Sequence, residues 1–244
     1  MRIKIATYNI HKGIGGVDRK YRLERIAEVI RHYEPDVVFL QEVDDGAPRS
    51  KRDRQADKLA TLTGLEHAAF QPNVKLREGV YGNAILSRFS LHDPVDIDLT
   101  IPFKKRRRAQ VTRLDLIEEG RHRSVALINL HLGLAGFERR IQLARLLHSS
   151  AVEGLHRDTP CFIGGDFNDV WGAIGMRIMK PAGFESASDC RRTFPAVAPV
   201  RPLDAIYYRG DCAPREVIVG RIHLARKASD HLPLIAEFKI GLGD

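Results

Sequence analysis

The sequence predicts a mixed α/β domain in which β-sheets are layered against helices. Short apolar runs typical of strands recur along the whole chain, and only a few stretches with helical spacing lie between them. No internal repeat, low-complexity tract or Pro/Gly/Ser-rich linker divides the 244 residues, of which 43% are apolar. We therefore expect a single domain over residues 1–244, with two sheets packed face to face and helices outside.

The first part of the chain alternates between strand and helix patterns. Residues 2–8 alternate apolar and polar side chains, which predicts a strand. Residues 21–33 carry apolar side chains at helical spacing, and the pattern stops before Pro35, so we predict a helix that ends there. Residues 36–43 are a β-branched run that is long enough only for a buried strand.

Two more helices and a series of strands follow. Helical patterning returns at residues 54–64 and 137–155. The predicted strands cover residues 82–88, 109–117, 123–132, 160–167, 203–209, 214–220 and 232–240. Because these strands do not alternate one to one with helices, a layered mixed arrangement is favoured over a simple alternating parallel sheet.

The chain is basic, with a formal net charge of +8 and an isoelectric point near 9.6. Part of this charge lies in the run KKRRR, Lys104 to Arg108. Such a charge balance favours a polyanionic partner, although a run of this kind is also typical of a solvated loop.

The composition also indicates where the protein works. The N-terminal segment is too short and too polar for the apolar region of an export signal, and no window has the roughly 18–20 apolar residues of a membrane span. The three cysteines, Cys161, Cys190 and Cys212, form no short-spaced pair, so neither a disulfide framework nor a zinc site is indicated. We expect a soluble, cytoplasmic protein without a transmembrane segment.

Polar side chains that can bind a ligand recur where the predicted strands begin or end. These residues are Asn9, Glu42, His131, Asp166 with Asn168, Asp204, and Asp230 with His231. At any one position a turn would also accept Asp or Asn, because these side chains bond their own backbone. Their recurrence at so many strand margins favours one shared site at a rim of the sheets.

The side chains of this set indicate the chemistry. Carboxylate and amide oxygens without cysteine suit a hard cation such as Mg²⁺ or Mn²⁺, and a neighbouring histidine suits proton transfer or contact with a phosphate. Hydrolysis of a phosphate ester needs a charge clamp on the phosphoryl oxygens, an oriented water and a stabilised leaving oxygen. The set can supply all of these.

The blocks TYNIHKG, LQEV, GNAILSR, NLHLG, GGDFND, LDAIYY and SDHLPL follow one another in that order. Together they closely resemble the endonuclease/exonuclease/phosphatase superfamily of DNase I-like enzymes, and the resemblance runs from Asn9 to His231. One block alone would be weak evidence, whereas the full series in register is specific. The resemblance implies a small bacterial-type member with a four-layer α/β sandwich, in which helices flank two packed mixed β-sheets and the active site lies at one edge.

The resemblance also implies roles for individual residues. Glu42 would be the principal metal ligand, with Asn9 and Asp230 as further ligands or close partners of the metal. Asp166, supported by Asn168, would orient and deprotonate the attacking water.

The histidines of the motifs receive roles in the same way. His231 would hydrogen-bond the scissile phosphate, while Asp204 would fix its tautomer and favour the imidazolium form. His131 stands where DNase-like and sphingomyelinase-like members have a second histidine and where AP endonucleases have a tyrosine, which makes abasic-site repair a poorer fit.

Two further side chains are candidates for contact with the substrate phosphate. Arg107 matches an arginine near the active site in several branches of the family, although the neighbouring Arg108 offers a second register. Asn83 falls on a strand near the site in relatives, and a strand-edge amide is an equally good interpretation.

Several neighbouring residues receive a plainer interpretation. We expect Trp171 to be a core or helix-start aromatic residue, and His11 and Lys12 to lie on the surface. We expect Cys161 to be buried in its strand. The segment 191–199 resembles the loop before the Asp204 strand in relatives and is expected to form one wall of the cleft.

We therefore expect a Mg²⁺- or Mn²⁺-dependent phosphoesterase that hydrolyses phosphodiester bonds. The basic charge places nucleic acid, DNA or RNA, first among substrates, ahead of a phospholipid head group at a membrane or a phosphorylated small molecule. A catalytically silent module that binds nucleic acid or membrane is the third hypothesis, and the filled acid and histidine positions weigh against it.

Overall fold

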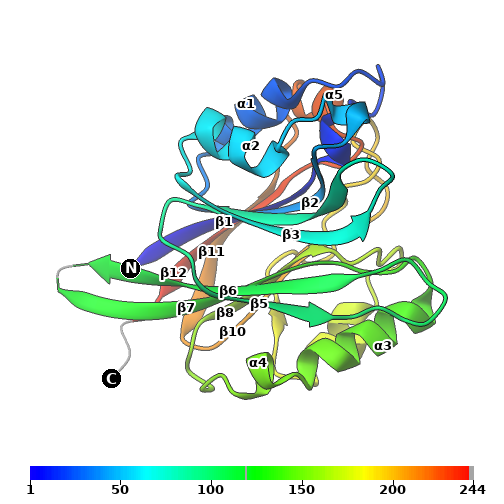
Figure 1. Cartoon of the computed structure of the whole chain (residues 1–244). Helices are drawn as coiled ribbons and strands as arrows, with labels where there is room; N and C mark the ends of the chain where they lie inside the picture. The colour runs from blue at the N-terminus through cyan, green and yellow to red at the C-terminus, as the bar shows by residue number, and fades with distance from the viewer. Residues whose placement is uncertain (119, 242–244) are drawn as a thin grey trace.

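Two six-stranded mixed sheets pack face to face in the computed structural model, which describes residues 1–118 and 120–241 (Figure 1). Helices cover the outer face of each sheet, above the upper sheet and below the lower sheet in Figure 1. The four-layer α/β sandwich predicted from the sequence is confirmed.

The first sheet has the strand order β11-β12-β1-β2-β4-β3. Its strands are β1 (Arg2–Asn9), β2 (Val37–Asp45), β3 (His67–Lys75), β4 (Val80–Ser87), β11 (Cys212–Val219) and β12 (Leu234–Ile240). Only β1 and β2 pair in parallel; the other neighbours are antiparallel. The helices α1 (Leu23–Tyr33), α2 (Gln55–Thr63) and α5 (Ala225–Ala228) lie over this sheet.

The second sheet has the order β5-β6-β7-β8-β10-β9. Its strands are β5 (His92–Asp98), β6 (Arg108–Glu118), β7 (Arg121–His131), β8 (Cys161–Asp166), β9 (Glu185–Ser186) and β10 (Asp204–Arg209). The pair β7 and β8 is parallel. The helices α3 (Gly136–Leu147) and α4 (Ser150–Glu153) and a π-helical turn (Gly175–Met179) cover its outer face, and short 3-10 turns lie at His11–Gly13 and Pro48–Ser50.

The core has three apolar layers because strand side chains alternate between faces. On β1, Ile3 and Ile5 point between the sheets, whereas Ala6 and Tyr8 point toward the helices. Cys161 lies fully buried beneath the second helical layer, as predicted. Apolar packing on both faces of each sheet holds the ends of the strands in defined positions.

The structure adds elements that the sequence pattern does not reveal. β3 and β5 each contain a proline, and β5 is an exposed edge strand, so neither shows a clean alternation. The short β9, α5 and the π-helical turn were also not predicted. The single helix predicted over residues 137–155 is wrong, because Ser149 adopts an extended backbone and its hydroxyl bonds the Leu146 carbonyl, which separates α3 from α4. None of the helices in the described part of the chain is long and apolar enough to cross a membrane.

Candidate active site

Strand ends from both sheets meet at one edge of the sandwich. Asn9, the last residue of β1, pairs with Gln41 of the parallel strand β2, which places Glu42 near Asn9. In the second sheet, His131 pairs with Asp166 across β7 and β8, and Asp204 pairs with the same Asp166 from β10.

These residues surround a cleft with a cavity of about 460 Å³. The predicted site residues that line it are Asn9, Glu42, Arg107, His131, Asp166, Asn168, Asp230 and His231. Asp204 does not line the cleft. Its Oδ2 bonds Nδ1 of His231, which does line it. The structure therefore brings together all but one of the predicted residues; the exception, Asn83, donates to the Gln71 side chain within the first sheet.

A β-bulge aims Glu42 into the cleft. The register of β2 against β4 shifts between Gln41 and Val43, and Glu42 has a left-handed φ of 57°. A bulge redirects one side chain of a strand, and a left-handed non-glycine residue is strained. The local backbone is thus shaped around the position of this carboxylate.

The two glycines before Asp166 allow close approaches that no side chain would permit. A Cβ on Gly164 would lie 2.3 Å from the Phe39 ring of the facing sheet, and a Cβ on Gly165 would lie 2.0 Å from the Leu130 carbonyl oxygen. Asn168 then turns the chain with a left-handed φ of 50°. The sequence GGDFN therefore lets β8 pack tightly and end with its carboxylate in the cleft.

Gly165→Ala is expected to destabilise the fold by about 1–3 kcal/mol or more, because the obstructing atom is backbone and cannot rotate away. Thermal unfolding followed by circular dichroism measures this loss. Gly136→Ala serves as the control, because its Cβ would meet nothing closer than 3.8 Å. Equal melting temperatures for the two variants would contradict the packing argument.

Asp166 is the centre of the hydrogen-bond network. Its Oδ2 accepts from Asn9 Nδ2 at 3.0 Å and lies 3.4 Å from His131 Nε2 and 3.9 Å from His231 Nε2. Its Oδ1 accepts from the Asn168 backbone NH at 2.9 Å. Burial is the largest influence on this carboxyl and raises its pKa to about 6, so Asp166 is mostly ionised at pH 7 and remains a usable base.

His231 is held by Asp204. Its Nδ1 lies 2.8 Å from Asp204 Oδ2, which also accepts from the Thr193 hydroxyl at 2.5 Å. Burial by itself lowers the pKa of His231, but the Asp204 charge and hydrogen bond outweigh it and raise the pKa to about 10. His231 is therefore an imidazolium at pH 7.

This pKa predicts a pH-dependent stability. In the unfolded chain the pKa of histidine is about 6.5. Because the folded value is higher, the stabilisation from protonated His231 is complete below pH 6.5 and is lost as the pH rises through about 10. The difference in free energy of unfolding between wild type and His231→Gln, measured in EDTA, should shrink across that window. A difference that grows with pH would contradict this assignment.

His131 differs from His231 in charge. It is buried, and burial is the main cause that lowers its pKa well below the ordinary value, with the Arg107 charge acting in the same direction. Its Nδ1 has no hydrogen-bond partner among the described residues. The site thus combines one neutral and one cationic imidazole on either side of Asp166.

A sequence profile of the Endonuclease/Exonuclease/phosphatase family matches residues 6–231 of this chain. The chain belongs to this family. Members of the family are hydrolases that act on phosphate esters and are generally dependent on divalent metal ions.

Relatives and solved structures agree with this membership. An Escherichia coli K12 protein, "Uncharacterized protein YbhP", is 28% identical over 249 residues, which cover 97% of this chain and 96% of the relative. An endonuclease/exonuclease/phosphatase structure from Beutenbergia cavernae matches with a TM-score of 0.79 and 21% identity, covering 98% of this chain and 72% of that one. The mannosyl-6-phosphatase Bt3783 of Bacteroides thetaiotaomicron matches with a TM-score of 0.76 and 15% identity, covering 98% and 100%. These structural likenesses show the shared fold.

The residues around Glu42 fit the divalent cation that the family generally uses. Burial opposes ionisation of Glu42, but its interactions with neighbouring side chains, among them the Lys12 ammonium, outweigh burial and hold its pKa below the ordinary range. Because burial keeps His131 neutral at pH 7, the Lys12 ammonium, which forms an ion pair with the carboxylate, is the cation that holds it ionised. A carboxylate already paired with a cation, which lines the same cavity as Asn9 and Asp230, has the donor chemistry of a hard metal site.

A second group could also hold a cation by distance alone. Ligand atoms of Asp166, Asp204 and His231 all lie within 4.8 Å of one another. However, His231 Nδ1 already bonds Asp204 and its Nε2 lies 3.9 Å from Asp166, so a cation held by these three residues would have to displace the His231–Asp204 hydrogen bond.

The basic run contributes on one side of the cleft. Arg107 and Lys105 line the cavity, and Arg107 Nε is buried without a hydrogen-bond partner among the described residues. Arg108 instead donates to the Pro72 carbonyl at 3.2 Å and lies 3.4 Å from Asp96. The structure therefore places Arg107, and not Arg108, in the cleft.

Several residues at the site were not predicted from sequence. His11 and Lys12, expected on the surface, are partly buried, and His11 Nδ1 lies 3.9 Å from Asp230. Phe194, from the segment 191–199 that was expected to form a wall, lines the cleft, and so does Arg201 beyond that segment. Trp171, expected in the core or at a helix start, is 86% exposed.

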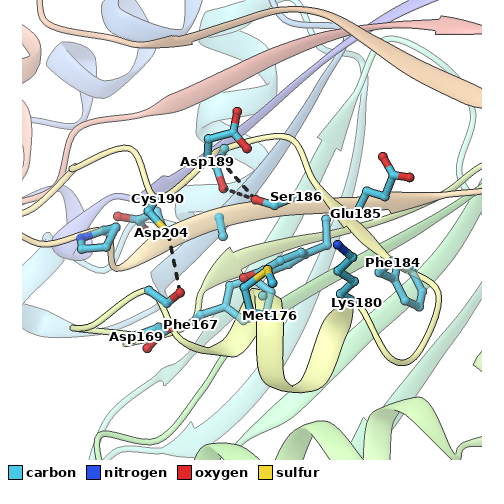
Figure 2. Close-up of a pocket in the computed structure, with 16 residues that line it drawn as sticks. Phe167, Asp169, Met176, Lys180, Phe184, Glu185, Ser186, Asp189, Cys190 and Asp204 are labelled. Carbon is cyan, nitrogen blue, oxygen red and sulfur yellow. Dashed lines mark hydrogen bonds between the residues drawn. The ribbon is translucent and has the colours of Figure 1, made fainter.

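A second cavity of about 440 Å³ lies on the other side of Asp204 (Figure 2). Aromatic rings and Met176 form much of its wall, and Asp204 is the predicted site residue that borders it. We assign the active site to the cleft because the carboxylates, amides and histidines converge there.

Proposed function

We propose that this protein is a divalent-cation-dependent phosphodiesterase whose active site is the cleft between the two sheets. The observation that carries this proposal is the convergence of Glu42, Asp166 and His231, from three distant segments, on one cavity. The family membership supports hydrolysis of a phosphate ester.

In the proposed reaction a water oxygen attacks phosphorus while the bond from phosphorus to the leaving oxygen breaks. Asp166 accepts the proton of the attacking water, and its pKa of about 6 keeps it ionised yet basic at neutral pH. Asn9 and Asn168 donate to the two oxygens of Asp166 and so fix the direction of this base.

The charge on the phosphate is stabilised by donors on the cleft wall. The His231 imidazolium, held by Asp204, presents its Nε2 toward Asp166 and so toward the reaction centre. Arg107 supplies a second cationic donor. Neutral His131 bonds the phosphate or the leaving group from the opposite side.

Glu42 would hold the cation, with Asn9 and Asp230 as further ligands or close partners. When bound, a cation such as Mg²⁺ or Mn²⁺ would neutralise phosphate charge and stabilise the leaving oxygen. Lys12 would then release Glu42, because both cations use the same carboxylate.

The substrate class follows from charge and surface. The basic composition made nucleic acid the first choice from the sequence, with a phospholipid head group second. A phosphorylated small molecule is a further alternative, in keeping with the sugar-phosphatase name of one structural neighbour. The surface beside the cleft favours the lipid class, because exposed apolar side chains lie next to lysines and arginines there.

Hydrolysis of bis-p-nitrophenyl phosphate tests the reaction type without assuming a natural substrate. We expect turnover that requires Mg²⁺ or Mn²⁺, is abolished by EDTA, and far exceeds that of Asp166→Asn. Turnover no greater than that of the variant would instead support a catalytically silent binding module.

A further inference from the structure

Large apolar side chains are exposed beside the mouth of the cleft. Phe103 is fully exposed, Trp171 is 86% exposed, and Leu134 is 77% exposed. Phe137 is more than half exposed, and Ile141 is exposed as well. We call these five residues, from the β5–β6 connection, the segment 134–141 at the start of α3 and the segment after β8, the apolar rim. An exposed cluster of this kind marks an interaction surface.

Contacts join the three segments into one face. Lys104 Nζ lies 5.4 Å from the centre of the Phe137 ring and 3.1 Å from Glu138, which ties the β5–β6 connection to α3. Phe137 and Trp171 border a common hollow of about 560 Å³. Figure 1 shows the β5–β6 connection close to α3, at the right-hand end of the lower sheet.

The apolar rim is continuous with the active-site cleft. Leu134 lines the cleft, and so does Val170, the residue before Trp171. Lys105, two positions after Phe103, lines it from the basic run. A surface on which the apolar rim rests would therefore face the opening of the cleft.

The charge of this face is positive. The exposed basic residues on the three segments are Lys104, Lys105, Arg106, Arg140 and Arg177, whereas Arg139 is buried and donates to the Leu134 carbonyl. The two acids at this face are buried and have partners: Glu138 pairs with Lys104, and Asp169, which borders the hollow, accepts from the Ile174 backbone NH. Exposed apolar tips beside exposed cations complement an anionic surface that has an apolar interior.

The apolar side chains distinguish lipid from nucleic acid. Binders of single strands combine basic grooves with flat aromatic side chains on which bases stack. Leu134 and Ile141 in the apolar rim are aliphatic and offer bases no such ring. Trp, Phe and Leu beside Lys and Arg are instead typical of proteins that lie in a bilayer interface.

We propose that the apolar rim docks on the surface of a bilayer that contains anionic phospholipid. The tips of Phe103, Phe137 and Trp171 enter the interface, the surrounding arginines and lysines contact lipid phosphates, and the cleft opens toward the head groups. The docking proposal depends only on the exposed surface. The statement that the substrate is a head-group phosphodiester rests also on the proposed function.

Trp171 provides a direct probe, because it is the single tryptophan of the chain. Its fluorescence is recorded while vesicles are added, either of phosphatidylcholine alone or with about 30 mol% phosphatidylglycerol, which supplies anionic charge. We expect a blue shift of the emission maximum with the anionic vesicles, and quenching by brominated acyl chains. An unchanged spectrum in both vesicle types would overturn the proposal.

Vesicle sedimentation tests the same face with matched variants. The triple variant Phe103→Ser/Phe137→Ser/Trp171→Ser should lower the partition coefficient onto anionic vesicles by at least about tenfold. The control Val95→Ser/Ile117→Ser/Ile218→Ser removes exposed apolar side chains from β5, β6 and β11 and should bind like wild type. Equal loss in both variants, or in neither, would contradict docking through the apolar rim.

Hydrolysis of bis-p-nitrophenyl phosphate by the same preparations separates this proposal from the catalytic one. The rim variant should keep wild-type turnover, because none of its three positions contributes to the catalytic groups. Vesicle binding without turnover would sustain docking and refute the catalytic proposal. Turnover with no vesicle binding, together with a Trp171 spectrum that responds only to single-stranded oligonucleotide, would assign the face to nucleic acid instead.

Discussion

Asp166→Asn is expected to lower kcat for bis-p-nitrophenyl phosphate by about 10²–10⁴ while leaving the fold and metal binding nearly intact. The amide has the size of the carboxylate but cannot accept the proton of the attacking water. Asn9, His131 and Asn168 are positioned around this carboxylate, and the neighbouring Asp204 is already bonded to Thr193 and His231, so it is not free to replace Asp166 as the base. Steady-state kinetics at saturating Mn²⁺ measures the effect.

Asp169→Asn is the matched control for this change. Asp169 is also buried and near the end of β8, but its Oδ2 accepts from the Ile174 backbone NH at 2.7 Å, away from the cleft. The Asp169→Asn variant should have a lower melting temperature than wild type and a kcat within about twofold of wild type, because structural changes outside the reacting groups act mainly on stability. A similar loss of kcat in both variants would show that Asp166 acts through the fold and not as the base.

Glu42→Gln is expected to weaken Mn²⁺ binding by at least about 10–100-fold, the range found when even supporting groups of a metal site are removed. The variant loses the charged oxygen that the bulge of β2 directs into the cleft. Titration calorimetry with Mn²⁺ alone measures the dissociation constant independently of turnover.

Lys12→Met and Asp45→Asn make the metal experiment specific. Lys12→Met keeps the length of the side chain but removes the ammonium that pairs with Glu42, so Mn²⁺ should bind as tightly as in wild type or more tightly. Asp45 lies on the same strand and lines no part of the cleft, so its variant should bind Mn²⁺ like wild type. Weaker binding in Lys12→Met than in Glu42→Gln would contradict the assignment.

Strand margins made the centre of the site predictable from sequence. The polar residues at the ends of β1, β7 and β8 and at the bulge within β2 follow buried runs, and parallel pairing of β1 with β2 and of β7 with β8 brings them to one edge. The motif series added the order and the fold. Asp204 pairs with Asp166 in the register of β10 against β8, and this pairing places it behind the site.

Features that depend on three-dimensional packing were not predictable. Lys12 sits in a left-handed turn that folds it onto Glu42, and nothing in the local pattern distinguishes it from a surface lysine. Trp171 was expected in the core or at a helix start because large aromatic residues are usually buried, whereas the structure shows it exposed in the apolar rim. β3 and β5 were not predicted from the sequence because each contains a proline, and in β5 most side chains also face solvent.

Anomalous scattering from crystals soaked in Mn²⁺ tests the central claim most directly. We predict a peak bonded to the Glu42 carboxylate inside the cleft, with Lys12 displaced and His231 still hydrogen-bonded to Asp204. A peak bonded instead to Asp204 and His231, or no peak in the cleft at a concentration of Mn²⁺ that supports full turnover, would contradict the account.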